Sequence, residues 1–151
     1  MRFIADRTLG KLAKALRMLG FDVIARRGEN AAEAASAAAG EGRLFLTRSR
    51  RGFDKVAGLQ SFIVEANDPR EQMKEVLTKL GLKPDPDRFF SRCLLCNEAL
   101  QPVSKEEVEG RVPDFIFASY ADFHLCPGCR RIYWPGTHFQ RMKEEWTGLA
   151  G

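Results

Sequence analysis

Four cysteines, the only ones among the 151 residues, stand in two pairs, Cys93/Cys96 and Cys126/Cys129. Two residues separate the members of each pair, so one tight turn can bring both thiolates to the same ion. Asn97, directly after the first pair, tolerates the left-handed backbone region that such a turn needs. Two turns of this kind can close a tetrahedral site in which each sulfur lies about 2.3 Å from a zinc ion.

Free thiols, disulfides or a redox pair are the alternatives to a metal site. A chain without an export signal is expected to fold in a reducing compartment, where paired cysteines bind metal more often than they form disulfides. Zinc is the expected metal, although four thiolates can also hold iron. Because twenty-nine residues separate the pairs, we predict a zinc ribbon with a long insert and with all four cysteines as ligands.

The composition, 44% hydrophobic and 29% charged, is that of a soluble globular protein. Asp6 and Arg7 interrupt the first apolar residues, so no signal peptide is predicted. No apolar run approaches the roughly 20 residues that a membrane helix needs. The expectation is a cytoplasmic protein without membrane contact, and the sequence leaves its oligomeric state open.

Apolar runs alternate with helical patterns over the first eighty residues. Strands are predicted at residues 1–5, 22–25, 44–47 and 61–64. Helices are predicted after Asp6 up to Gly20, from Asn30 to about Gly40, and from Asp68 to Gly81. Such alternation predicts an α/β domain with a parallel sheet and crossover helices on its faces. The second helix is rich in alanine, so it should pack closely on the sheet.

The rest of the chain has fewer periodic patterns. Two prolines and two aspartates in residues 83–90 predict a linker. We therefore divide the chain into an α/β domain (1–82), a linker (83–90), the ribbon (91–142) and a C-terminal tail (143–151). Within the ribbon, residues 115–117 and 132–134 have β-like composition. A domain this small buries little core, so its metal should supply part of its folding free energy.

Carboxylates near the ends of the predicted strands are candidates for a second metal site. Asp6 follows the first strand, and Glu33 lies in the first turn of the helix after the second strand. Ligands gather at the carboxyl ends of parallel strands, and carboxylates there could bind Mg²⁺ or Mn²⁺ and activate water on a phosphodiester. The alternative is that Asp6 and Glu33 only cap helices. Asp22 begins a strand, so simple topology puts it at the other edge, and Asp54 could point to this site or to solvent.

Basic residues are concentrated in the first part of the chain. Residues 1–60 hold twelve Lys/Arg against six Asp/Glu, a net +6, whereas residues 61–151 hold twelve against fourteen, a net −2. The basic side chains expected near the carboxylates could bind an RNA backbone or could simply be solvated: Lys11, Arg17, Arg48, Arg50 and Arg51. Bases could stack on ribbon aromatics, although these more often form the core: Tyr133, Trp134 and Phe139.

Several of these segments together resemble the Mut7-C RNase domain family. They are residues 3–13, 16–22, 43–48 and 91–97, and the Cys126–Cys129 turn followed by residues 133–138. The resemblance covers residues 2–142 and implies a PIN-like parallel α/β sheet with flanking helices, followed by a small zinc-ribbon domain. It also implies metal-dependent cleavage of RNA, with Asp6, Asp22 and Glu33 as the candidate catalytic carboxylates and Mg²⁺ or Mn²⁺ as the cofactor.

Two positions depart from the family pattern. The segment that ends in Arg48 is normally followed by an aspartate, and this chain has Ser49. An acidic residue is also usual at the very start of the second helix, where this chain has Asn30 and Ala31, with Glu29 and Glu33 nearby. Fewer carboxylates weaken cation binding. The rival hypothesis is therefore an RNA-binding or adaptor module that has lost its catalytic activity.

Overall fold

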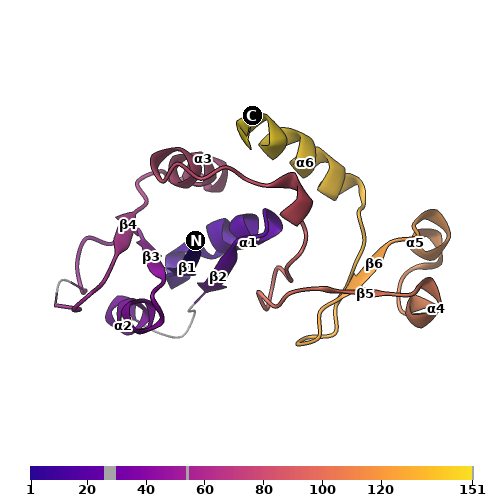
Figure 1. Cartoon of the computed structure of the whole chain (residues 1–151), viewed down its shortest axis with the longest axis horizontal. Helices are drawn as coiled ribbons and strands as arrows, with labels where there is room; N and C mark the ends of the chain where they lie inside the picture. The colour runs from indigo at the N-terminus through magenta and orange to yellow at the C-terminus, as the bar shows by residue number, and fades with distance from the viewer. Residues whose placement is uncertain (26–29, 54, 151) are drawn as a thin grey trace.

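A computed structural model describes residues 1–25, 30–53 and 55–150. The chain forms two parts (Figure 1). The first eighty residues form a parallel sheet with helices on both faces, and the cysteine-containing part is built on a small antiparallel sheet. The last helix returns from the second part to the first.

The larger sheet is parallel throughout, with strand order β2-β1-β3-β4. Its strands are β1 (Arg2–Ala5), β2 (Asp22–Ala25), β3 (Leu44–Thr47) and β4 (Ser61–Ile63). Phe3, Ile4 and Phe45 on the two central strands are fully buried. Because these strands are covered on both faces, their sequences are continuous apolar runs. The predicted parallel α/β sheet is confirmed.

Helices cover both faces of this sheet. They are α1 (Gly10–Met18), α2 (Ala31–Glu41) and α3 (Pro69–Lys79). Side chains of α1 and α3 share one core with the sheet, and α2 covers the opposite face. Ala34, Ala35 and Ala38 of α2 pack on Ile4 and Phe45. The small alanine side chains let this helix lie close to the sheet, as its composition predicts.

The smaller sheet carries the cysteine turns. Its strands are β5 (Gln101–Val103), β6 (Phe123–Leu125) and β7 (Ile132–Tyr133), paired antiparallel in the order β5-β6-β7. The connection from β5 to β6 is the predicted insert, and it contains α4 (Lys105–Val108) and α5 (Asp114–Ser119). Val108 and Val112 of this insert pack on Phe123 of β6. The strand expected at residues 132–134 is present as β7.

The prediction of a β-like run at residues 115–117 is wrong, because these residues lie in α5. Helical spacing lets Ile116 and Phe117 both pack on the ribbon core while Phe115 is 76% exposed. A strand would have put Phe115 and Phe117 on the same face. The helix directly follows Pro113, whose fixed φ suits the start of a helix.

Residues 83–90, predicted as a linker, pack on the α/β part. They contain one short turn, η2 (Pro86–Arg88). Phe89 is buried in the same core as Leu12 and Leu16 of α1. The Phe90 N–H donates to the carbonyl oxygen of Met18 over 2.9 Å. This segment therefore fixes where the ribbon begins relative to the sheet.

The C-terminal helix α6 (Thr137–Ala150) runs across the boundary predicted between ribbon and tail. Its Met142 and Trp146 are buried in the main core of the α/β part. Arg70 of α3 forms an ion pair with Glu145 of α6, and Figure 1 shows the two helices on the same side of the sheet. No helix in the described part of the chain is long and apolar enough to cross a membrane.

Candidate functional site

The four cysteines converge on one point. Their Sγ atoms all lie within 4.8 Å of one another, and those of Cys93 and Cys129 are 3.7 Å apart. Four sulfurs about 2.3 Å from a central zinc ion would be about 3.8 Å apart, so the cluster has the size of a four-sulfur metal site. All four thiols are free of disulfides. The convergence predicted from the two pairs is confirmed.

The two cysteine turns have the same backbone geometry. Asn97 and Arg130 follow the turns with φ values of 65° and 68°, and their N–H groups donate to the carbonyl oxygens of Cys93 and Cys126, each over 2.9 Å. Within each turn, the N–H of the second cysteine donates to the sulfur of the first over 3.4 Å. The left-handed role of Asn97 is confirmed. Arg130 has the same left-handed conformation, which an arginine does not lead one to expect from the sequence.

The electrostatics of the cluster favour a cation at its centre. Burial raises the pKa of the Cys93 thiol, but hydrogen bonds from the Tyr133 hydroxyl and from backbone N–H groups outweigh burial and lower the pKa to about 7. The pKa of Cys96 is raised to about 12, because it shares a hydrogen bond with Cys129 and lies beside the other sulfurs. Four thiolates therefore need a bound cation to be ionised together.

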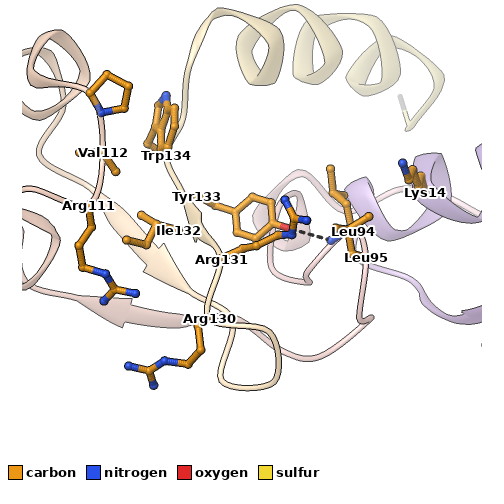
Figure 2. A pocket seen from close by; sticks show the side chains of 11 residues that line it. Lys14, Leu94, Leu95, Arg111, Val112, Arg130, Arg131, Ile132, Tyr133 and Trp134 are labelled. Carbon is orange, nitrogen blue, oxygen red and sulfur yellow. Dashed lines mark hydrogen bonds between the residues drawn. The ribbon is translucent and has the colours of Figure 1, made fainter.

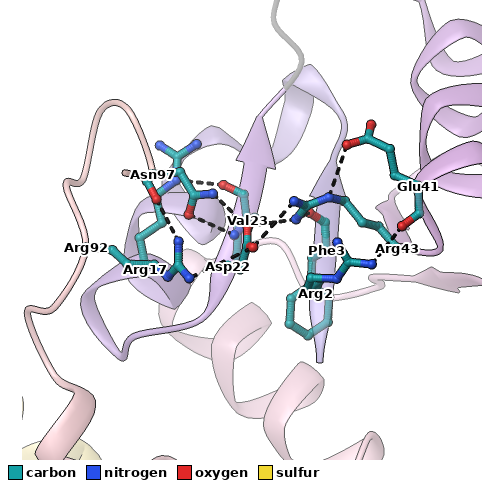
Figure 3. A network of polar contacts seen from close by, with 9 residues as sticks. All are labelled: Arg2, Phe3, Arg17, Asp22, Val23, Glu41, Arg43, Arg92 and Asn97. Carbon is teal, nitrogen blue, oxygen red and sulfur yellow. Dashed lines mark hydrogen bonds and ion pairs between the residues drawn. The ribbon is translucent and has the colours of Figure 1, made fainter. Parts of the chain in front are cut away.

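The first cysteine turn is bonded directly to the α/β part (Figure 3). Arg17 of α1 donates from Nε to the carbonyl oxygen of Val23 over 2.8 Å and from Nη1 to that of Leu94 over 2.6 Å. The Val23 N–H donates to Oδ1 of Asn97 over 2.9 Å. These three bonds join α1, β2 and the metal turn. Arg17 is 6% exposed, so its guanidinium is committed to this contact rather than presented to solvent.

Asp22 belongs to the same network and lies away from Asp6. It is level with Arg2 at the start of the parallel strands, whereas Asp6 follows the last residue of β1. Arg43 and Asn97 each donate to its Oδ1 over 2.7 Å. Partial burial raises the pKa of Asp22, but these two hydrogen bonds outweigh it and hold the pKa below its usual range. The structure does not bring Asp22 together with Asp6.

Replacing Asp22 by asparagine is expected to cost stability in a pH-dependent way. A depressed folded-state pKa means that the ionised carboxylate stabilises the fold above its unfolded-state pKa of about 4, and that this stabilisation is lost as the pH falls through the folded-state pKa. We expect wild type to be more stable than Asp22→Asn by about 2 kcal/mol at pH 7. Urea unfolding followed by circular dichroism from pH 7 to pH 3 measures this difference.

The matched control for this substitution is Asp87→Asn, which removes an exposed carboxylate that forms no hydrogen bond or ion pair with a described residue. The free energy of unfolding of Asp87→Asn should differ little from that of wild type at every pH. Metal loss in acid affects all three proteins, so only the differences at each pH are compared. If wild type and Asp22→Asn differed in free energy of unfolding by the same amount at pH 7 and at pH 3, the ion-pair account would be contradicted.

Asp6 lies at the opposite edge, where β1 ends. It caps the short helix η1 (Arg7–Leu9) and is 7% exposed. Its Oδ1 accepts the N–H of Thr8 over 2.9 Å and the Thr8 hydroxyl, and its Oδ2 accepts the hydroxyl of Thr47. Thr47 ends the neighbouring strand β3 and also accepts the N–H of Ser49 over 3.0 Å. Asp6 thus caps a helix, as the alternative to a metal site expected, and its Oδ2, which accepts one hydrogen bond, keeps a lone pair for a further ligand.

Glu33 is exposed in the first turn of α2, where Asn30 caps the helix as predicted, but the Glu33 carboxylate reaches the Asn30 side chain and not its N–H, so the capping box is incomplete. The Glu33 N–H donates to Oδ1 of Asn30 over 2.8 Å, and the Glu33 Oε1 accepts from Nδ2 of Asn30 over 3.1 Å. Among the described residues, the four cysteines are the single group of three or more metal-binding side chains within reach of one ion. Glu29 and Asp54, the other carboxylates considered for this edge, lie outside the described residues.

The basic residues predicted to bind RNA fall into different environments. Arg48 donates to Oδ1 of Asn67, and Arg50 forms an ion pair with Glu65 over 2.8 Å. Lys11 and Arg51 are exposed and have no ion pair with any residue that the structure describes. Arg17 is buried, as described above. The loop after β3 is therefore tied by its arginines to the segment after β4.

A basic hollow of about 530 Å³ opens beside Asp6. It is lined by Arg7, Thr8, Gly10, Lys11 and Lys14. Thr8 both lines this hollow and donates two hydrogen bonds to the Asp6 carboxylate. A polyanion in the hollow would therefore lie next to the buried carboxylate at the end of β1. Lys14 was not among the predicted RNA-binding residues, although it lies one helical turn after Lys11.

The family model of the Mut7-C RNAse domain matches residues 1–146 of this chain. No curated protein and no solved structure matches it. The family match covers the sheet, the cysteine turns and most of the C-terminal helix, so it agrees with the resemblance drawn from the separate motifs. The chain belongs to the Mut7-C RNAse domain family.

Proposed function

We propose that this protein is a metal-dependent ribonuclease whose reaction takes place beside Asp6. The observation that carries the proposal is the carboxylate of Asp6, buried at the carboxyl end of a parallel strand and bordered by the basic hollow that Thr8 also lines. Ligands of parallel α/β folds bind at this edge. The family supports RNA as the substrate.

In this proposal Asp6 is a ligand of Mg²⁺ or Mn²⁺, and Glu33 contributes from the first turn of α2. Carboxylate oxygens are the ligands these ions prefer, and a bound ion supplies a water nucleophile and stabilises charge on the phosphate. Thr8 and Thr47 orient the Asp6 carboxylate through their hydroxyls. Arg7 and Lys11 neutralise phosphates of the RNA in the adjoining hollow.

The four cysteines are proposed to hold a structural zinc ion rather than iron or a disulfide. A closed set of four sulfurs leaves no open position for a substrate, which is typical of structural zinc. We also propose a cytoplasmic location, because reduced thiols and zinc are compatible with a reducing compartment. Metal analysis of the purified protein identifies the ion, and one zinc per chain is the expected result.

Replacing Asp6 by asparagine tests the ribonuclease directly. Asparagine is as good a helix cap as aspartate, so the fold should persist while the negative ligand is lost. Cleavage of labelled single-stranded RNA with Mg²⁺ or Mn²⁺ should fall by about 100-fold or more, the loss typical of removing a group that stabilises developing charge. Asp87→Asn, which removes an exposed carboxylate on η2, should cleave as wild type does.

The rival function is an RNA-binding module without catalysis. Ser49 favours it, since the family usually has an aspartate there and Ser49 donates its hydroxyl to the Arg51 carbonyl instead. This rival predicts RNA binding without turnover at any concentration of divalent metal. Cleavage that is unchanged in Asp6→Asn would contradict the proposed site, and no cleavage by either protein would favour the rival.

A further inference from the structure

A second hollow, of about 540 Å³, lies where α1 faces the ribbon (Figure 2). We call it the ribbon groove. Its lining combines three parts of the chain: Lys14 of α1, the first cysteine turn with Leu94 and Leu95, and the ribbon itself. The ribbon contributes Arg111, Val112, Pro113 and the run from Arg130 to Trp134. The groove is therefore formed only when the ribbon is docked on α1.

The charge of the ribbon groove is entirely positive. Lys14, Arg111, Arg130 and Arg131 line it together, and no acidic residue in the described ranges of the chain does. All four side chains are exposed, and none forms an ion pair with another described residue. Residues 61–151 have a net charge of −2, so three arginines on this one face are not a consequence of composition. Unpaired cations that share one hollow repel one another, and a polyanion removes that repulsion.

The ribbon groove adjoins the basic hollow beside Asp6. Lys14 lines both. Starting at Arg7, next to Asp6, a chain of phosphates would meet Lys11 and Lys14 on α1 and then the arginines of the ribbon. The two hollows thus form one basic path that connects the proposed reaction site with the ribbon.

The apolar part of the lining suits unpaired bases. The Tyr133 hydroxyl accepts the N–H of Leu94 over 3.2 Å and contacts Sγ of Cys93 at 3.1 Å, so its ring is held in one orientation. Trp134 packs on Phe123 with ring centroids 6.5 Å apart and still lines the groove. Leu95 is 41% exposed. Aromatic and apolar surface beside cations is typical of proteins that bind single strands, whose bases are free to stack.

We propose that the ribbon groove binds the single-stranded RNA on one side of the cleavage position, with Lys14, Arg111 and Arg131 contacting its phosphates. This inference rests on the proposed function for the identity of RNA as the ligand. It assigns the ribbon a part in substrate binding in addition to its metal site. It also explains why the first cysteine turn is bonded to α1 and β2, since that contact aligns the two hollows.

The test measures RNA binding in the Asp6→Asn background without added Mg²⁺ or Mn²⁺, so that cleavage does not interfere. A fluorescein-labelled 15-nucleotide single strand is titrated with the zinc-containing protein at several salt concentrations. Arg111→Gln combined with Arg131→Gln should weaken binding by about tenfold or more. The slope of log K against log salt should become shallower by about 1.4, because each lost phosphate contact on a single strand accounts for about 0.7.

The matched control also removes two positive charges, but from exposed side chains outside both hollows. It combines Lys83→Gln with Arg141→Gln. Its affinity should stay within about twofold of the parent protein, with an unchanged salt slope, as expected for distant surface charges. Zinc content and circular dichroism spectra of all variants should match. A duplex of the same sequence should bind more weakly than the single strand.

Equal affinity and salt slope for the groove variant and its control would overturn this inference, as would duplex RNA binding as tightly as the single strand. Those results leave the Asp6 cleavage assay untouched, so the proposed function could still stand. Conversely, loss of affinity confined to the groove variant, in a protein that cleaves nothing, would support the groove and contradict the ribonuclease. The two failures are therefore distinguishable.

Discussion

Removing the metal, or replacing Cys93 by serine, is expected to unfold the ribbon. Its own core is small and centres on Val108, Val112 and Phe123, and a domain of this size rarely folds without a metal or a disulfide. Structural zinc sites contribute roughly 10 kcal/mol or more of binding free energy at neutral pH. With that contribution gone, the four thiols also lose the cation that lets them ionise together.

Unfolding of the ribbon should also destabilise the α/β part, but to a smaller extent. When the first cysteine turn unfolds, Arg17 loses the Leu94 carbonyl and Val23 loses the Asn97 side chain. Two partly buried hydrogen bonds of this kind contribute about 1 kcal/mol each. Amide hydrogen exchange of the apo protein should therefore show full exposure of β5, β6 and β7, together with faster but still protected exchange in β2.

A control for the cysteine substitution is Ala118→Ser, which introduces the same hydroxyl at an exposed position of α5. It should keep the protection pattern of wild type. Adding zinc back to the chelated protein should restore the ribbon. Retained protection of β6 after complete removal of the metal would show that the ribbon core is sufficient without it.

The second large effect is expected at Arg17. Arg17→Met keeps much of the side-chain volume but leaves the carbonyl oxygens of Val23 and Leu94 without their buried donor. An unsatisfied buried polar group costs about 1–3 kcal/mol, so we expect the free energy of unfolding to fall by roughly 3 kcal/mol. Urea denaturation with saturating zinc measures it.

Lys14→Met is the matched control, because Lys14 is an exposed cation on the same helix, one turn before Arg17. Exposed substitutions usually change stability by about 0.5 kcal/mol or less. The two variants should separate two properties: Arg17→Met loses stability, and Lys14→Met loses RNA affinity. If Arg17→Met kept its stability and lost RNA affinity, the sequence-based assignment of Arg17 to phosphate binding would be right and the structural account wrong.

Much of the fold follows from local sequence patterns. The buried strands, the capped helices and the two cysteine turns each have signals within a few residues, and the family motifs connect them. The strand order β2-β1-β3-β4 and the antiparallel pairing in the ribbon depend on long-range contacts, so these local signals do not give them. Residues 115–117 are the exception, because an aromatic run suits a strand and a short helix equally until its neighbours are known.

The side chains around the sites are harder to predict. Lys14 and Arg17 are both basic residues of one helix, and only the position of the docked ribbon decides that Arg17 is buried and Lys14 exposed. Thr47 reaches Asp6 because β3 lies beside β1, a long-range pairing that its own sequence does not show. Asp22 has the residue type of a metal ligand, yet at the far edge of the sheet it forms an ion pair with Arg43 and accepts a hydrogen bond from Asn97.

The path of the chain through the ribbon has a consequence for synthesis. The ribbon is inserted between Phe89 and the residues of α6 that complete the main core, and the Phe90 and Phe139 rings, 4.5 Å apart, join its entry and exit. A ribosome that has finished residue 82 must still add the 64 residues up to Trp146 before that core can close. At roughly 5–20 residues per second this takes roughly 3–13 s, during which the main core of the nascent α/β part lacks the Met142 and Trp146 side chains that complete it.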